Sequence, residues 1–127
     1  MIVFFGDHQP ADSVVRPVWK LNGKDDANLT DEEEALRYKV PFFIWANFDI
    51  EAESDLEISA NYLAAKTLDA AGLPESAYDN FLSQLRTEVP VISANHVTLS
   101  DGTFTTASKQ KDLLYDYQTL QYYLLFD

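Results

Sequence analysis

The sequence predicts an α/β fold, in which helices pack against a sheet. Two continuous apolar runs, Met1–Phe5 and Val40–Phe48, have the composition of strands that are covered on both faces, as in a parallel sheet. Amphipathic helical patterns follow the second run, and strands alternate with helices along the chain, as an α/β layer requires. A length of 127 residues suffices for one core, so we expect residues 1–127 to form a single domain.

Between the two apolar runs, the sequence predicts irregular chain followed by a short helix. Residues 10–29 contain two prolines and an Asn-Gly step, which are typical of turns. Thr30 and Glu33 have the spacing of a capping box. We therefore expect an acidic helix from about Asp31 to Tyr38.

Two further helices are predicted after the acidic connector of residues 49–57. The first begins after Ser59 as its N-cap and ends at Gly72, which has the position of a C′ glycine. The second extends from about Pro74 to Arg86. Its apolar residues recur at helical spacing and predict one buried face: Tyr78, Phe81, Leu82 and Leu85.

The last part of the chain predicts extended segments and then a helix. Residues 89–107 contain two runs of strand-forming residues joined by Ser-Asp-Gly, a pattern typical of a hairpin. The final helix, from about Lys109, carries one apolar stripe: Leu113, Tyr117, Leu120 and Leu124. Because the other face of this helix lacks the basic residues that anionic membranes attract, we expect the stripe to pack on the core.

The composition restricts the functions that are plausible. The 9 basic and 21 acidic residues give a net charge of −12, which opposes binding to a phosphate backbone, so no nucleic-acid partner is expected. The absence of cysteine excludes disulfides, thiolate zinc sites and cysteine nucleophiles. The chain contains no apolar run of about 20 residues and no signal-peptide pattern, so we expect it to be soluble by itself.

The segment FFGDHQP, residues 4–10, carries the clearest chemical signal. Ligands of α/β sheets bind at the carboxyl ends of strands, and Gly6 allows a sharp turn there, so that Asp7 and His8 can reach one ion. A carboxylate and an imidazole suit Zn²⁺, Mn²⁺ or a similar divalent ion. The spacing alone leaves a more frequent alternative open, in which Asp7 caps a loop and His8 is a surface residue.

Longer segments resemble a known enzyme family. IVFFGDHQP, RYKVPFFIWANFDIE, ISANYLAAKTLDAAGLP, YDNFLSQLRTEVPVI and YDYQTLQYYLLFD are similar, in this order, to the C-terminal part of lipoteichoic-acid-synthase-like sulfatases, which belong to the alkaline phosphatase superfamily. The resemblance implies the C-terminal portion of an alkaline phosphatase/sulfatase-like α/β/α sandwich. It also implies that Asp7 and His8 are metal ligands at the end of a central strand. The implied ion is Mn²⁺ or Mg²⁺, with Zn²⁺ and Ca²⁺ as alternatives.

In that family the nucleophilic threonine, a glutamate ligand, a substrate-binding histidine and the membrane helices lie upstream of this segment. The resemblance therefore assigns no catalytic or substrate-binding residue here. It implies a segment of a metal-dependent phosphoglycerol transferase or sulfatase-like enzyme that acts on phosphate or sulfate esters of the cell envelope. Phosphoryl transfer in such an enzyme passes through a phosphothreonine-type intermediate. The expected partners are the upstream part of the same polypeptide and a glycerophospholipid or polyanionic envelope polymer. The expected parent is membrane-anchored, with an extracellular catalytic domain, in a Gram-positive-type bacterium.

Several alternatives accompany this interpretation. A self-standing, non-catalytic α/β interaction module is the second function class. His96 is expected to be a structural or surface residue, Arg16 to be solvated, and Trp45 to lie in the core, since it stands inside an apolar strand. Without upstream neighbours, the two apolar runs would leave unpaired edges, so the chain is expected to be inactive alone and to form homo-oligomers.

Overall fold

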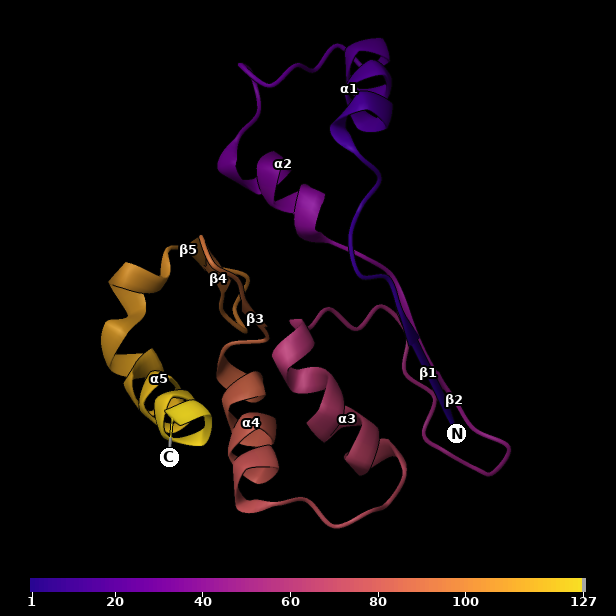
Figure 1. Ribbon diagram of the computed structural model, residues 1–127, viewed down its shortest axis with the longest axis vertical. Helices are drawn as coiled ribbons and strands as arrows, with labels where there is room; N and C mark the ends of the chain where they lie inside the picture. Colours follow the sequence, from indigo (N-terminus) through magenta and orange to yellow (C-terminus); the bar gives the residue numbers. More distant parts are fainter. Residues whose placement is uncertain (127) are drawn as a thin grey trace. The chain divides into compact units, whose positions relative to one another are not determined.

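The computed structural model describes residues 1–126, which form two compact units (Figure 1). The first unit is Met1–Phe48, and the second begins at Asp49. Helices and small antiparallel sheets occur in both parts of the chain, so the predicted mixed α/β content is confirmed.

The first unit is built on a two-stranded antiparallel ribbon. β1 (Ile2–Phe5) pairs with β2 (Phe42–Trp45), with Ile2 opposite Trp45 and Phe5 opposite Phe42. The chain between the two strands forms α1 (Asp12–Leu21), α2 (Asp31–Ala35) and a 3-10 turn, Leu36–Tyr38.

The two apolar runs form strands, as predicted, but these strands are antiparallel and half exposed. Phe4 and Trp45 each retain 53% of their accessible surface. Side chains of a two-stranded ribbon pair across the strands, and the rings of Phe4 and Phe43 stack in this way with centroids 5.3 Å apart, but two strands alone bury little of their surface. The predictions of doubly covered parallel strands and of a core position for Trp45 are therefore wrong. Apolar composition shows which side chains favour burial, whereas burial itself requires a covering layer.

The helix α1 corrects the prediction of irregular chain at residues 10–29. It continues through Pro17, although a proline inside a helix removes one backbone hydrogen bond. Asp12 in the first turn and Lys20 in the last complement the helix dipole. One turn apart, Asp12 and Arg16 form an ion pair of 3.4 Å. These local interactions favour the helix where the prolines alone predicted turns.

The helix α2 begins as predicted. The Thr30 hydroxyl accepts a hydrogen bond from the Glu33 N–H at 3.2 Å, and the Glu33 carboxylate accepts one from the Thr30 N–H at 3.0 Å. This is the predicted capping box.

The second unit contains the buried core of the described chain. Its central residue is Tyr62, which is fully buried and whose hydroxyl donates a hydrogen bond to the Val89 carbonyl at 2.8 Å. Eight residues make up this core: Tyr62, Ala65, Leu82, Leu85, Val89, Val97, Leu114 and Tyr117.

The helices α3 and α4 supply three of these eight residues: Ala65, Leu82 and Leu85. A 3-10 turn, Ala60–Tyr62, leads into α3 (Leu63–Ala70). Gly72 ends this helix, as predicted, with φ +63 and two hydrogen bonds of a Schellman motif: Gly72 N–H to Asp69 and Leu73 N–H to Leu68, both 3.0 Å.

The helix α4 (Ala77–Glu88) begins later than predicted. Ser76 and Asp79 form a second capping box, which places the N-cap two residues after Pro74. The predicted face is confirmed, because Leu82 and Leu85 are buried and the aromatic residues of the same stripe pack against the core.

Three short strands and α5 complete the second unit. β3 (Val91–Ile92), β4 (Val97–Thr98) and β5 (Phe104–Thr105) form an antiparallel sheet, which includes the predicted hairpin. After a 3-10 turn, Ala107–Gln110, comes α5 (Lys111–Phe126). Leu114 and Tyr117 are buried, whereas Leu124 is 61% exposed. The predicted stripe therefore packs on the core only in the first half of this helix.

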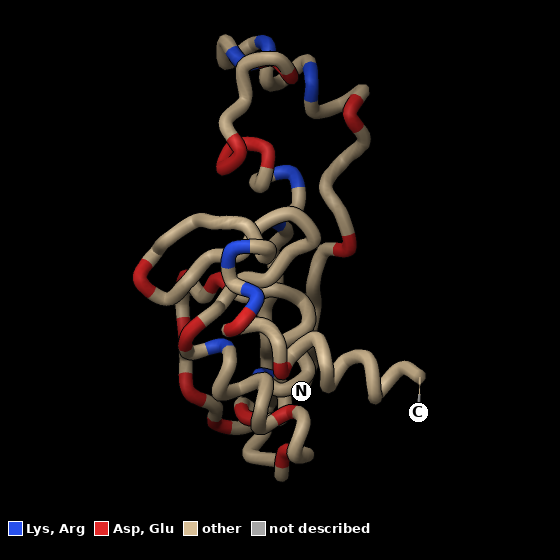
Figure 2. The backbone as a smooth tube through the Cα atoms, turned by 90° about the vertical axis from the view of Figure 1, so that its left-hand side faces the viewer, with Lys and Arg blue, Asp and Glu red and all other residues tan. Residues whose placement is uncertain are grey.

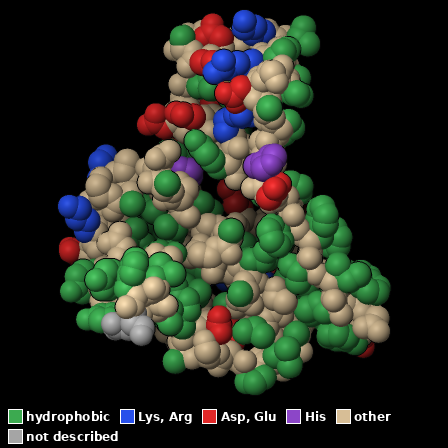
Figure 3. All heavy atoms as spheres, in the orientation of Figure 1, with side chains coloured by type: hydrophobic (Ala, Val, Ile, Leu, Met, Phe, Trp, Pro, Cys, Tyr) green, Lys and Arg blue, Asp and Glu red, His purple; other side chains and the backbone are tan. Residues whose placement is uncertain are grey.

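The surface of the described chain is acidic and carries apolar areas. Acidic residues are spread along both units (Figure 2). Hydrophobic side chains gather over the β1–β2 ribbon and over α5 (Figure 3). Among residues 1–126, no helix has both the length and the apolar character needed to cross a membrane.

The buried hydroxyl of Tyr62 leads to a prediction about stability. Tyr62→Phe should lower the free energy of unfolding by about 1–3 kcal/mol, because the buried Val89 carbonyl loses its donor. Burial raises the pKa of Tyr62, whereas an unfolded tyrosine has a pKa of about 10. The protonated Tyr62 therefore contributes its full stabilisation below the unfolded pKa, and this is lost as the pH rises toward the folded pKa.

Urea unfolding of the full chain, measured from neutral to strongly alkaline pH, tests this expectation. The free energy of unfolding should decrease with pH in the wild type and decrease less steeply in Tyr62→Phe. Tyr115→Phe is the matched control, because Tyr115 is 66% exposed. An unchanged slope in Tyr62→Phe would contradict the assignment.

Candidate metal centre

Asp7 and His8 directly follow β1, at the carboxyl end of the strand. The preceding Gly6 donates its N–H to the Pro41 carbonyl at 3.0 Å and so extends the pairing of the ribbon. A Cβ at Gly6 would lie 3.0 Å from the Cβ of Val40, and Gly6 is not among the residues with positive φ. The chain bends at Asp7, directly after the glycine, and at Gly6 the lack of a side chain allows the close approach of Val40.

A local hydrogen bond places the side chains of the two predicted ligands next to each other. The His8 N–H donates to Asp7 Oδ1 at 2.9 Å, which folds the carboxylate back toward the imidazole. Asp7 Oδ2 then lies 3.5 Å from His8 Nε2. Both side chains are open to solvent, with 81% of Asp7 and 78% of His8 exposed. The structure thus brings together the two residues that the sequence singled out.

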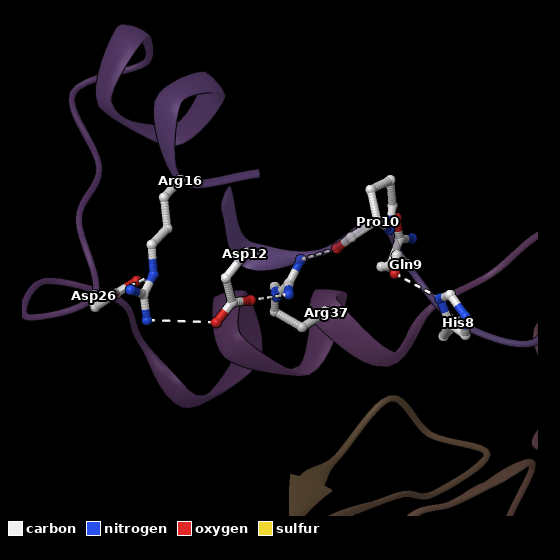
Figure 4. A network of polar contacts seen from close by, with 7 residues as sticks. All are labelled: His8, Gln9, Pro10, Asp12, Arg16, Asp26 and Arg37. Atoms are coloured by element: carbon white, nitrogen blue, oxygen red, sulfur yellow. Dashed lines mark hydrogen bonds and ion pairs between the residues drawn. The ribbon is translucent and has the colours of Figure 1, made fainter. Parts of the chain in front are cut away.

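One contact of His8 favours one tautomer of its neutral ring. Its Nδ1 lies 2.8 Å from the Gln9 carbonyl oxygen (Figure 4). Because a carbonyl only accepts hydrogen bonds, Nδ1 carries the proton and Nε2 keeps a lone pair in the neutral ring. Metal-binding histidines commonly donate their second N–H to a carbonyl in this way. The lone pair of Nε2 and the Asp7 carboxylate are therefore two electron-rich donors side by side.

Their separation fits a shared divalent ion. Two ligands of a tetrahedral zinc ion, at the usual bond lengths, lie about 3.4 Å apart, and neighbouring ligands of an octahedral magnesium ion about 2.9 Å apart. The observed 3.5 Å between Oδ2 and Nε2 is close to the tetrahedral value. The donor types and the distance therefore suit a metal. Within residues 1–126, however, no group of three or more His, Cys, Asp or Glu side chains is placed to hold one.

The loop after His8 is held by two residues that the sequence analysis did not identify. The Gln9 side-chain amide donates to the Lys39 carbonyl, and the Arg37 guanidinium donates to the Pro10 carbonyl at 3.5 Å. Arg37 also pairs with Asp12 (Figure 4). These partners are separated by 25 to 30 residues in the sequence, so no local pattern could have predicted them.

Arg16 extends the same network. It contacts Asp12 at 3.4 Å and Asp26 at 2.9 Å (Figure 4). The Arg37 guanidinium also lies over the Trp19 ring, 5.4 Å from its centroid. Arg16 is 54% exposed, but it is paired and not simply solvated as predicted. Its two carboxylate partners leave it little capacity to bind a substrate phosphate.

His96 lies in the second unit and makes structural contacts. Its Nδ1 is 2.8 Å from Ser93 Oγ, and its ring stacks on Phe104 with centroids 4.7 Å apart. Ser93 Oγ also accepts the N–H of His96 at 3.0 Å, so this serine closes a turn and is poorly suited to act as a nucleophile. The expectation that His96 is a structural residue agrees with these contacts.

No family model, curated protein or solved structure matches this chain. The assignment of Asp7 and His8 therefore depends on their donor chemistry, on the 3.5 Å between them and on the orientation of the His8 ring.

We expect divalent metal to bind the full chain only weakly. Mn²⁺ and Zn²⁺ titrations should not saturate at micromolar metal, because two exposed ligands lack the ligand number of a stable site. With Zn²⁺, the nitrogen NMR shift of His8 should change at Nε2 and not at Nδ1.

Variants make this test specific. Asp7→Asn and His8→Gln should abolish the weak binding, whereas His96→Gln should retain it. A one-to-one micromolar complex would contradict the expectation, since it would require a third ligand within this chain.

Proposed function

We propose that this chain is the C-terminal segment of a metal-dependent phosphoglycerol transferase or sulfatase-like enzyme. Its substrates would be phosphate or sulfate esters of the cell envelope, such as a glycerophospholipid or a polyanionic envelope polymer. The parent enzyme would be membrane-anchored with an extracellular catalytic domain, and this segment would contribute two ligands of its metal ion. The proposal starts from the resemblance of the sequence segments to that family.

The observation that carries the proposal is the arrangement of Asp7 and His8. A carboxylate and an imidazole lie 3.5 Å apart at the end of a strand, and the proton of His8 is held on Nδ1 by the Gln9 carbonyl. The alternative of a loop-capping aspartate beside a surface histidine is compatible with the same contacts, because the His8 N–H donates to Asp7 Oδ1 and both side chains are exposed. Both side chains are exposed, so further ligands and a substrate can approach them.

The roles of this chain's residues follow from that geometry. Asp7 Oδ2 and His8 Nε2 would hold Mn²⁺ or Mg²⁺, or alternatively Zn²⁺ or Ca²⁺. Such an ion polarises phosphoryl oxygens and lowers the pKa of a hydroxyl nucleophile. Gln9 and Arg37 would keep the loop after His8 in place, because their side chains bind backbone carbonyls on either side of it. The nucleophile would come from upstream sequence.

The finer fold is also part of the proposal. In the parent, β1 would belong to the sheet of an α/β/α sandwich, and upstream segments would cover the apolar ribbon. The accessible surface area of the chain supports the proposal that covering segments are absent. Two separate compact domains of 48 and 79 residues would expose about 8,200 Å² together, and contact between domains only reduces this area. The chain exposes 9066 Å².

A self-standing interaction module is the second candidate. The exposed apolar residues favour it, because large apolar patches commonly mark binding surfaces. They lie on the ribbon and on the last turns of α5: Ile2, Phe4, Phe5, Phe43, Trp45, Tyr122, Tyr123, Leu124, Leu125 and Phe126. Such a module would have no need of the paired donors at Asp7 and His8.

The coding sequence upstream of Met1 provides the decisive test. An in-frame extension with a candidate threonine nucleophile would allow the longer protein to be expressed and assayed for phosphodiester and sulfate-ester hydrolysis with Mn²⁺. Asp7→Asn and His8→Gln should each lower kcat by at least about 100-fold in that protein, since the metal loses a ligand. The present chain alone should show no turnover.

Matched controls separate loss of chemistry from loss of folding. His96→Gln should retain activity, because His96 contacts only its own turn and Phe104. Full activity in the Asp7 and His8 variants would overturn the proposed enzyme. Turnover by the 127-residue chain that disappears in Asp7→Asn would overturn the proposal that it is only a segment.

Self-association is the outcome we expect for the chain without its upstream part. The free strand edges and apolar side chains of the ribbon favour pairing with a second copy. The net charge of −12 opposes association at low salt, so the mass measured by sedimentation should increase with salt concentration. Phe4→Lys together with Phe43→Lys should reduce it, whereas Tyr115→Lys on α5 is the control. A monomer at high concentration and high salt would contradict this expectation.

A further inference from the structure

The second unit contains a polar pocket that the proposed function does not use. It lies between the turn that ends α3 and the exposed face of α4, and its volume is about 500 Å³. Sites for small molecules typically have volumes of about 300–1,000 Å³. Gly72 and Leu73 form one wall, and Asn80, Ser83 and Arg86 form the other.

The two carboxylates at this pocket already have donors. Asp69 Oδ2 accepts a hydrogen bond from the Lys66 ammonium at 3.2 Å. Glu75 Oε1 accepts one from the Ser83 hydroxyl at 2.7 Å. The acidic groups of the pocket are therefore already hydrogen-bonded and are poorly placed to bind a cation.

By contrast, N–H groups of two residues on the α4 wall are available to donate hydrogen bonds. Asn80 Oδ1 accepts from the Gln84 amide at 2.6 Å, which leaves the two N–H groups of Asn80 available. Arg86 is partly buried, and residues 1–126 provide it with no ion pair or hydrogen bond. Arg16 and Arg37, the other arginines of the chain, each contact an aspartate.

The lack of a partner for Arg86 is informative in this chain. With 21 acidic residues against 9 basic ones, a guanidinium readily finds a carboxylate. The position of Arg86 in the last turn of α4 gives it a favourable interaction with the helix dipole. That interaction explains why the charge is tolerated there, but it leaves the five N–H donors of the guanidinium unused.

We propose that this pocket binds a monoanionic oxyanion group, a carboxylate or a phosphodiester, with Arg86 as its anchor. The guanidinium fork would bind two oxygens of the group, and the Asn80 amide would donate to the same group. Lys66 is shared between Glu53 and Asp69, so Arg86 is, within the described residues, the one cation at the pocket that is left for a bound anion. A single negative charge matches that one guanidinium. A dianion or polyanion is disfavoured by the net charge of −12.

NMR titration of the full chain with three probes tests this proposal. Propionate represents a carboxylate, dimethyl phosphate a phosphodiester, and inorganic sulfate a dianion. Propionate or dimethyl phosphate should shift the Arg86 Nε–H signal and the Asn80 side-chain amide signals in one saturable process. The probe that binds more tightly identifies the group that the pocket takes, and sulfate should bind more weakly than either.

Variants of Arg86 distinguish a binding site from a general charge effect. Arg86→Gln should weaken binding by at least about tenfold, which corresponds to one lost charge-assisted hydrogen bond. Arg86→Lys should retain part of the affinity, because it keeps the charge but loses the fork. Arg16→Gln, in the first unit, should bind as the wild type does.

Three results would overturn the proposal: equal affinity in the wild type and Arg86→Gln, shifts that never saturate, or sulfate as the tightest probe. Urea unfolding of each variant shows whether it is folded. If Arg86→Gln does not fold, the comparison of the wild type with Arg86→Lys provides the test. The test does not involve Asp7 or His8, so its outcome is independent of the proposed enzyme function.

Discussion

In the second unit, a set of hydrogen bonds joins residues 59–62 to residues 88–92, and we call this contact the seam. At its centre the buried Tyr62 hydroxyl donates to the Val89 carbonyl at 2.8 Å. The Ser59 N–H donates to the Pro90 carbonyl at 3.1 Å, and the Ile92 N–H donates to Ser59 Oγ at 3.0 Å. This seam fixes the start of α3 against the end of α4, and the small sheet continues from it.

The first unit has a different physical basis. None of the residues 1–48 is buried, and the segments between the two strands are held by ion pairs and by hydrogen bonds from side chains to backbone carbonyls. Exposed ion pairs contribute at most about 1 kcal/mol each. A hydrogen bond from Lys24 lowers the pKa of Glu33 in the capping box, so this part of the network weakens when acid protonates Glu33. The candidate metal centre thus lies in the part of the chain with the least hydrophobic support.

Local features were predictable from the sequence, and features that depend on distant neighbours were not. The Thr30–Glu33 box and the Gly72 terminus were found because the residues that form them are close in sequence. The antiparallel partner of β1, about 40 residues away, and the exposure of both strands were missed. The pairing of Asp7 with His8 was anticipated, since they are adjacent. The supports from Gln9 and Arg37 were not, because their partners lie 25 to 30 residues away.

The two candidate ligands directly follow β1, and the pairing of that strand limits what could complete the proposed metal site. Within the described chain β1 pairs only with β2, so no strand pairs with its other edge. Parallel neighbours in a sheet bring their carboxyl ends to one side, where ligands bind. An upstream strand parallel to β1 would therefore end beside Asp7 and His8 and could deliver further ligands. A second copy related by a two-fold axis would pair antiparallel across this edge and place its own Asp7 and His8 at the opposite end. Dimerisation through β1 would cover apolar surface without raising metal affinity, whereas the upstream strand would do both.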